Sequence, residues 1–261
     1  MYENLLELAQ KVGAGAAELL MDRPPAFEIE SKSTAIDIAT QMDIKAEKFI
    51  VDALLSARPD DGIIGEEGTN REGTSGITWV IDPLDGTVNY VYGLPGWNVS
   101  IAARDANLGN SDMGGEMVVG VVTAPTINST WWAMRGAGAF YNGAQISCNN
   151  PIELDRALIG TGFQYDVKHR ISQIEDFAKL SPVVRDLRRN GAAAVDLCHV
   201  AMGAMDGYYE AGLKEWDWAA GGLIAREAGA LFTQYGQAPT QITVVAGPYL
   251  HGKLEEFLAL T

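Results

Sequence analysis

The residues with the clearest chemical potential lie in an acidic segment that follows an apolar run. Residues 78–81 (Thr-Trp-Val-Ile) have the composition of a β-strand, and residues 82–87 (Asp-Pro-Leu-Asp-Gly-Thr) follow directly. The two acids are separated by a stiff proline, so their carboxylates could converge on a cation such as Mg²⁺, which prefers oxygen ligands. The amides of Gly86 and Thr87 stand at the start of an expected helical turn, where free N–H groups bind phosphate. One short segment could therefore hold both metal and substrate.

Two other acidic segments carry similar potential. Glu66 and Glu67 are bracketed by glycines directly after another short apolar strand, and Asp217 lies between two tryptophans at an expected helix start. Each has an ordinary structural explanation when taken alone, because solvated acids are common in loops and aspartate is a good N-cap residue. The combination of the three segments is what favours a metal site.

Apolar periodicity and turn residues predict the elements that must position these acids. Helices are expected over residues 5–20, 43–57, 171–188 and 192–205, and from residues 217 and 251 onward. β-strands are expected over 62–65, 78–81, 98–103 and 117–123, in a hairpin over 130–141, and around 208–209, 231 and 244. This mixture predicts one continuous α/β unit with two lobes, residues 1–150 and 151–261, of which the first carries most metal ligands and the phosphate turn.

Composition limits the classes of partner. The 261-residue chain has a formal net charge of −15, which repels polyanions, so nucleic acid is a poor partner and phosphate chemistry would need a metal. The longest apolar runs are far shorter than the roughly 20 residues that cross a bilayer. No leader pattern is visible at the N-terminus, so the cytoplasm is the expected compartment. The two cysteines, Cys148 and Cys198, exclude a cysteine-type zinc site and make a disulfide framework improbable.

Together these motifs resemble the inositol monophosphatase family. The resemblance is carried by residues 65–67 (GEE), 79–89 (WVIDPLDGTVN) and 216–229 (WDWAAGGLIAREAG), with further matches over 32–43 and 191–198, in the family's order. It covers nearly the whole chain. It implies a layered αβαβα sandwich of the inositol monophosphatase and fructose-1,6-bisphosphatase type, hydrolysis of a small phosphorylated polyol by metal-activated water, lithium sensitivity, and a homodimer without nucleic-acid or membrane partners.

The resemblance also implies roles for individual residues. Two or three Mg²⁺ ions would be held by Glu66, Asp82, the backbone carbonyl of Leu84, Asp85 and Asp217. The catalytic group would comprise Glu66 and Asp82 with Thr87, which orients the attacking water together with Glu66, and Asp43, which supports that water. The substrate would be contacted by Asp85, Gly86, Thr87, Gly191, Ala193, Glu210 and Asp217.

Several alternatives stay open. Fructose 1,6-bisphosphate, histidinol phosphate and 3′-phosphonucleotides are handled by relatives with similar motifs, although Glu210 favours an uncharged polyol such as that of inositol monophosphate. A non-catalytic binding or regulatory relative is a less favoured reading. Val88 and Ala230 depart from the family pattern without touching an implied ligand. Residues 247–253 have the spacing of a P-loop, but Leu254 stands where the hydroxyl residue is required.

The arginines at 185, 188 and 189 form a basic cluster in the sequence. It reads most simply as the solvated end of the helix expected over 171–188. A second phosphate or a partner could also meet it.

Overall fold

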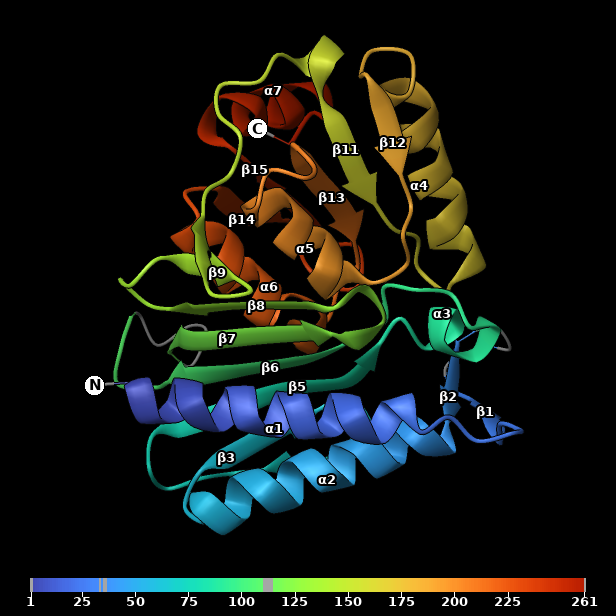
Figure 1. The fold of residues 1–261 in the computed structure, drawn as a ribbon. Coiled ribbons are helices and arrows are strands. Elements are labelled where there is room, and N and C mark those ends of the chain that lie inside the picture. The colour runs from blue at the N-terminus through green and yellow to red at the C-terminus, as the bar shows by residue number, and fades with distance from the viewer. Residues whose placement is uncertain (1, 33, 35–36, 110–114, 261) are drawn as a thin grey trace.

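The computed structural model describes residues 2–260 apart from residues 33, 35–36 and 110–114. Its elements stack in five alternating layers of helices and sheets (Figure 1). Helices α1 (Glu3–Met21) and α2 (Gln41–Ala57) cover one face of an eight-stranded sheet, and α5 (Ala193–Ala201) and α6 (Glu215–Glu227) lie between this sheet and a five-stranded one. Helices α4 (Val167–Leu180) and α7 (Pro248–Phe257) form the last layer. The expected αβαβα sandwich is confirmed.

The eight-stranded sheet carries most of the implied ligands. Its order is β10-β9-β8-β7-β6-β5-β3-β4, and all neighbours are antiparallel except β3 and β5. The strands are β3 (Gly62–Gly65), β4 (Asn70–Arg71), β5 (Ile77–Asp85), β6 (Asn98–Asp105), β7 (Glu116–Ala124), β8 (Ser129–Met134), β9 (Ala139–Tyr141) and β10 (Ala144–Ile146). A short separate hairpin joins β1 (Ile29–Ser31) and β2 (Ile38–Thr40).

The end of β5 differs from the expectation in one respect. The acidic segment does not follow the strand as a turn, because β5 continues to Asp85 with a shift in its pairing register to β6 between Asp82 and Asp85. Such irregularities re-aim side chains at the end of a strand. The six-residue helix α3 (Thr87–Tyr92) begins immediately afterwards, with Gly86 as its N-cap at a φ of 86° that favours glycine.

The five-stranded sheet has the order β12-β11-β13-β15-β14. Strand β11 pairs parallel with both β12 and β13, and the other pairs are antiparallel. The strands are β11 (Leu158–Thr161), β12 (Asp186–Arg188), β13 (Gly207–Ala211), β14 (Leu231–Tyr235) and β15 (Ile242–Ala246). Single 3₁₀ turns lie at Pro125–Ile127 and Leu154–Arg156. The division into two lobes near residue 150 stays a prediction.

The helix expected over 171–188 is wrong in its second half. Helix α4 begins at Val167, where Asp166 caps it by accepting hydrogen bonds from the amides of Lys168 and His169, and it ends at Leu180. Pro182 cannot continue a helix, and the chain then enters β12, the edge strand of the second sheet. The arginine cluster is therefore not a helix end. Arg188 belongs to β12, and Arg185 and Arg189 flank that strand.

The remaining features agree with their ordinary explanations. Residues 247–253 form the start of α7, with Gly247 as N-cap and Pro248 in the first turn, and not a phosphate loop. Cys148 and Cys198 are free thiols. Among the described residues, no helix is long and apolar enough to span a bilayer.

Candidate active site

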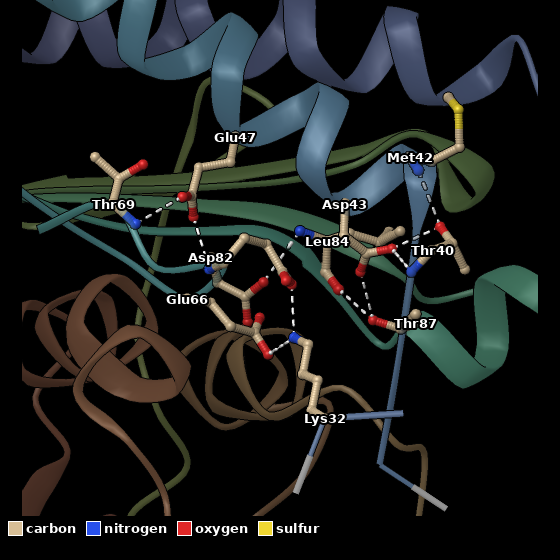
Figure 2. Close-up of polar contacts among 11 residues, drawn as sticks. Lys32, Thr40, Met42, Asp43, Glu47, Glu66, Thr69, Asp82, Leu84 and Thr87 are labelled. Carbon is tan, nitrogen blue, oxygen red and sulfur yellow. Dashed lines mark hydrogen bonds and ion pairs between the residues drawn. The ribbon is translucent and has the colours of Figure 1, made fainter. Parts of the chain in front are cut away.

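The predicted acids come together from distant parts of the chain. Glu66 directly follows β3, Asp82 and Asp85 end β5, and Asp217 is the third residue of α6. Because β3 and β5 run parallel, their carboxyl ends lie at the same edge of the sheet, and the backbone amide of Glu66 donates to the carbonyl oxygen of Ile81 at 3.2 Å. Figure 2 shows Glu66 and Asp82 facing each other beside Leu84.

Asp217 does not occupy the N-cap position itself. Lys214 is the N-cap of α6, and Asp217 caps the helix from its first turn, because its Oδ2 accepts a hydrogen bond from the Lys214 amide at 2.6 Å. The other carboxylate oxygen remains available to the cavity that Asp217 lines together with Asp85 and Glu210. The structural and functional interpretations of this residue are therefore compatible.

Burial is the main influence on the pKa values of this group, and repulsion between its members adds to it. Burial raises the pKa of Asp82 well above its usual range, and the charges of Glu66, Asp85 and Asp217 raise it further. Burial and the charges of Glu66 and Asp85 likewise raise the pKa of Asp217. Burial raises the pKa of Asp85 to about 7, against the hydrogen bonds from Asn98 and Ala194 that lower it. A site of this kind favours positive charge, whether from protons, a side chain or a metal ion.

A cationic side chain meets the edge of this group. Lys32 Nζ lies 2.9 Å from Glu66 Oε1 and 2.6 Å from Glu67 Oε1 (Figure 2). Burial lowers the pKa of Lys32, but the pairing with Glu66 and Glu67 outweighs it and raises the pKa above its usual range. The match over residues 32–43 included Lys32 without indicating this contact.

A buried glutamate holds the loop that carries Glu66. Glu47, on α2, accepts hydrogen bonds from the backbone amides of Glu67 at 2.8 Å and Thr69 at 3.0 Å (Figure 2). The sequence analysis assigned no role to Glu47. Its position on the inner face of α2, one turn after Asp43, is the signal that could have indicated one.

Thr87 and Asp43 form a buried hydrogen-bonded chain beside the acids. The Thr87 hydroxyl lies 2.8 Å from Asp43 Oδ1 and 3.1 Å from the Leu84 carbonyl oxygen, both of which can accept its proton. The other carboxylate oxygen of Asp43 accepts hydrogen bonds from the Thr40 amide at 2.8 Å and the Thr40 hydroxyl at 2.6 Å, which caps α2. Both sides of the Asp43 carboxylate are thereby fixed, so it orients the Thr87 hydroxyl.

The donor set agrees in type with a hard divalent cation. Glu66, Asp82, Asp85, Asp217 and the Leu84 carbonyl offer only oxygen atoms, which Mg²⁺ prefers. Within the described part of the chain, however, no three His, Cys, Asp or Glu side chains are arranged as a coordination shell. Asp85 Oδ2 accepts hydrogen bonds from Asn98 Nδ2 and the Ala194 amide, each at 2.9 Å, which fixes this carboxylate. The residues thus fit a metal by chemistry and location, with side chains that would have to turn toward it.

A cavity of about 110 Å³ opens beside the acids. Five of the predicted substrate residues line it, namely Asp85, Gly191, Ala193, Glu210 and Asp217. Gly86 lies next to this wall, since a Cβ on Gly86 would come within 3.3 Å of the Cβ of Ala192. Two of the acids expected to bind metal, Asp85 and Asp217, therefore line the same cavity as the expected substrate residues.

Glu210 is the acid at the far end of this cavity. It accepts a short hydrogen bond from the Tyr208 hydroxyl, and burial raises its pKa to about 7. Gly162 lies against it so closely that a Cβ there would come within 2.0 Å of Glu210 Oε2. Glu210 therefore presents its carboxyl group to this cavity.

Two other charged residues that line the cavity, Arg189 and Asp196, were not among the predicted site residues. The sequence analysis interpreted the arginine cluster most simply as a solvated helix end and left open that it meets a second phosphate or a partner. Arg189 lies two residues before Gly191, and Asp196 lies three residues after Ala193. Their closeness to the matched segment 191–198 is the signal that could have indicated a site role.

Comparisons with known proteins find similar proteins over most of the chain. The model of the inositol monophosphatase family matches residues 1–259. The inositol-1-monophosphatase SuhB of Mycobacterium tuberculosis is 41% identical over 243 residues, which cover 88% of this chain and 80% of the relative. The Nus factor SuhB of Vibrio cholerae is 42% identical over 237 residues, which cover 90% of this chain and 85% of the relative.

A solved structure confirms the similarity in three dimensions. The extragenic suppressor protein SuhB from Bartonella henselae superposes with a TM-score of 0.88 at 31% identity, covering 98% of both chains. The family match, the identities and this superposition each extend over almost the entire chain. The chain therefore belongs to the inositol monophosphatase family and is a phosphatase.

Proposed function

We propose that this phosphatase hydrolyses the phosphate monoester of a small polyol, with inositol monophosphate as the expected substrate, and that it depends on two or three Mg²⁺ ions. The observation that carries the proposal is the convergence of Glu66, Asp82, Asp85 and Asp217, which is supported by their positions at the ends of β3 and β5 and the start of α6 and by the charges of Glu66 and Asp85, which, besides burial, raise the pKa values of Asp82 and Asp217. Four buried or half-buried acids with so little cationic compensation are unfavourable unless function requires them.

The metal would be held by Glu66, Asp82, the Leu84 carbonyl, Asp85 and Asp217. When bound, Mg²⁺ lowers the pKa of a water and neutralises charge on the phosphoryl group and the leaving oxygen. The Lys32 ammonium already neutralises one of these ligands, since it forms an ion pair with Glu66. Lys32 would therefore have to leave Glu66 when a cation binds there.

The protein's own part in water activation falls to Thr87 and Asp43. Asp43 fixes the hydroxyl of Thr87, and Thr87 with Glu66 would accept hydrogen bonds from the attacking water. The first amides of α3, at Gly86 and Thr87, would hold phosphate oxygens, because helix-initial N–H groups lack partners within the helix. Both functions meet at Thr87, which places the water beside the phosphorus atom without a covalent enzyme intermediate.

The substrate's hydroxyl groups would lie toward Glu210, with Gly191 and Ala193 forming the adjacent wall. A carboxylate accepts hydrogen bonds from hydroxyls and repels a second phosphate, so Glu210 favours an uncharged polyol. Arg189 lines the same cavity and would attract an anion instead. Fructose 1,6-bisphosphate, histidinol phosphate and 3′-phosphonucleotides therefore remain the alternative substrates.

A substrate panel tests the proposal. Phosphate release is measured from inositol 1-phosphate, fructose 1,6-bisphosphate and histidinol phosphate, each with Mg²⁺ and with EDTA. We expect the highest kcat/KM for inositol 1-phosphate and no turnover in EDTA. A preference for the bisphosphate that disappears in Arg189→Gln would reassign the substrate, and turnover in EDTA would contradict the role of the metal.

A second candidate role comes from the names of relatives. The Vibrio cholerae relative and an Escherichia coli relative that is 37% identical are both called Nus factor SuhB, and the former matches this chain as well as the phosphatases do. Replacing the Vibrio protein with this chain, and with its Asp82→Asn variant, would test that role separately from phosphatase activity. The net charge of −15 disfavours direct contact with nucleic acid, whether the chain acts as a Nus factor or as a phosphatase.

A further inference from the structure

Helix α3 begins with Thr87, whose hydroxyl is proposed to orient the attacking water, but the helix is too short to hold its own position. It has six residues, and isolated helices shorter than roughly 12 residues are marginal in water. The Tyr90 amide donates to the Gly86 carbonyl oxygen at 3.0 Å, so residues 86–90 form one hydrogen-bonded turn. Contacts that fix Tyr90 therefore also fix Thr87.

A buried hydrogen bond joins this turn to α1. The Tyr90 side chain is fully buried, and its hydroxyl donates to the Leu20 carbonyl oxygen at 2.7 Å. Leu20 lies in the last turn of α1, and the residue four positions later is Pro24, which has no N–H to donate. Tyr90 therefore supplies the partner that the Leu20 carbonyl lacks within its own helix. Figure 1 shows α3 near the C-terminal end of α1.

A cationic side chain holds the other end of α3. The Arg23 guanidinium, in the connection after α1, donates to the carbonyl oxygens of Tyr90 at 2.7 Å and Val91 at 3.3 Å. Carbonyls in the last turn of a helix need partners from outside the helix, and a positive charge there complements the helix dipole. The guanidinium also lies 5.3 Å from the ring centroids of Phe27 and Tyr90, within the range of a cation–π contact.

Aromatic packing connects Tyr90 back to the start of the same turn. The Tyr90 ring meets the rings of Phe27 and Trp97 edge-on, with centroids 5.5 Å and 5.0 Å away. Trp97 is itself buried and packs against Gly86, since a Cβ on Gly86 would come within 3.3 Å of the Trp97 Cα. The turn is thus held by its neighbours at both ends, and Tyr90 takes part in most of these contacts.

We propose that Tyr90 and Arg23 are positioning residues for the phosphatase reaction, which hold α3 so that the Thr87 hydroxyl stays against Asp43. This role rests on the proposed function of Thr87. The Thr87 hydroxyl lies 2.8 Å from Asp43 Oδ1, so a small displacement of α3 lengthens this contact and misplaces the hydroxyl. The carboxylates expected to bind metal lie outside α3, on β5, on α6 and after β3, so metal affinity does not depend on this anchor.

Tyr90→Phe tests the buried hydrogen bond, because it removes the hydroxyl and keeps the ring. With the ester of the substrate panel that the wild type hydrolyses fastest, kcat should fall by about tenfold, while KM and the Mg²⁺ concentration for half-maximal activity stay within about twofold. Tyr2→Phe is the matched control and should keep the wild-type kcat, because the Tyr2 hydroxyl donates to Asp105 Oδ2 at 2.8 Å at the opposite end of α1. A Tyr90→Phe variant with wild-type kcat overturns the role.

A double-mutant cycle separates positioning from a general loss of stability. In Thr87→Val the hydroxyl is already absent, so adding Tyr90→Phe should lower kcat by no more than about twofold. A further tenfold loss in that background would show that Tyr90 does not act through Thr87, and overturns the proposal. An unchanged kcat in Thr87→Val itself would instead contradict the proposed function of Thr87, and this role with it, so the two failures are distinguishable.

Arg23→Gln tests the second anchor by removing the charge and shortening the side chain. Arg23 is exposed, so kcat should fall by a smaller factor of about threefold, and Arg23→Lys, which keeps a cationic donor, should recover it. Arg71→Gln is the matched control, since Arg71 also donates to a backbone carbonyl, that of Pro59 at 2.5 Å, but on the edge strand β4. Equal kcat values in the wild type and Arg23→Gln, or an equal loss in Arg71→Gln, overturn the role of Arg23.

Discussion

The Thr87 hydroxyl lies 2.8 Å from Asp43 Oδ1, which joins the start of α3 to the start of α2 in a buried contact. Because the other Asp43 oxygen accepts two hydrogen bonds from Thr40, the carboxylate has little freedom to turn. The Thr87 oxygen keeps its lone pairs for a water while its proton is directed toward Asp43 or Leu84. A residue that is only structural would not need such an orienting pair beside four acids.

Thr87→Val should remove this orientation while preserving the shape of the residue. We expect kcat to fall by roughly 10²-fold or more, in line with the contribution of positioned proton-transfer groups, with a small change in KM. Thr87→Ser retains the hydroxyl and should stay within about tenfold of the wild type. Steady-state kinetics checks both, and a Thr87→Val variant with wild-type kcat contradicts the role.

Asp82→Asn should abolish phosphatase activity while the protein stays folded. In the wild type, Asp82 Oδ1 accepts a hydrogen bond from the Leu84 backbone amide at 3.0 Å, and the asparagine side chain keeps an oxygen that can accept it. The substitution also removes one of four mutually repelling charges. In EDTA the variant should therefore unfold at a higher temperature than the wild type at pH 8. Thermal unfolding and phosphate release measure the two effects, and near-normal turnover means that Asp82 is not a shared metal ligand.

Lys32→Gln should change metal binding rather than folding. The Lys32 ammonium competes for Glu66, so its removal should lower the Mg²⁺ concentration for half-maximal binding by roughly threefold to tenfold, which corresponds to about 1 kcal/mol. Lys48→Gln is the matched control, because Lys48 also pairs with an acid, Asp52, but on the exposed surface of α2. Isothermal titration with Mg²⁺ distinguishes them. Equal affinities in wild type and Lys32→Gln would show that the ammonium does not compete.

Glu210 should make stability depend on pH near neutrality. Its pKa is about 7 in the folded protein against 4.5 in an unfolded chain, so the folded state binds more protons between these values. The free energy of unfolding contributed by this group therefore falls as pH rises from about 4.5 to about 7, by at most roughly 3 kcal/mol. Glu210→Gln should gain stability over the wild type at pH 8 but not at pH 4.5. Urea unfolding in EDTA at both pH values tests this, and a difference that is the same at both contradicts the assignment.

Helices and strands could be predicted where the pattern of their own residues determines them. The apolar row of α1, the apolar positions of α2 and the strand that leads into Asp82 all express the local pattern of their own segment. The second half of the helix expected over 171–188 failed because β12 forms through pairing with β11, a contact that no local pattern contains. Pro182 was the one local sign of that break.

The same distinction holds for the site. The acids were predictable because Glu66, Asp82 and Asp85 lie at the ends of apolar segments, Asp217 lies at a helix start, and their motifs resemble a family. Lys32 and Glu47 were not assigned, because their roles depend on how β1, α2 and the loop after β3 approach one another in three dimensions. The position of Arg189 depended on the wrongly extended helix, so its place in the cavity was missed together with β12.

The central claim is that Glu66, Asp82, Asp85 and Asp217 hold divalent cations beside the amides of Gly86 and Thr87. A crystal structure of the full chain grown with Mn²⁺, with anomalous data collected at the manganese edge, tests it most directly. We expect at least two anomalous peaks within coordination distance of these four carboxylates and the Leu84 carbonyl, with the Lys32 ammonium displaced from Glu66. A well-ordered structure with no peak there, at a Mn²⁺ concentration that supports turnover, would contradict the account.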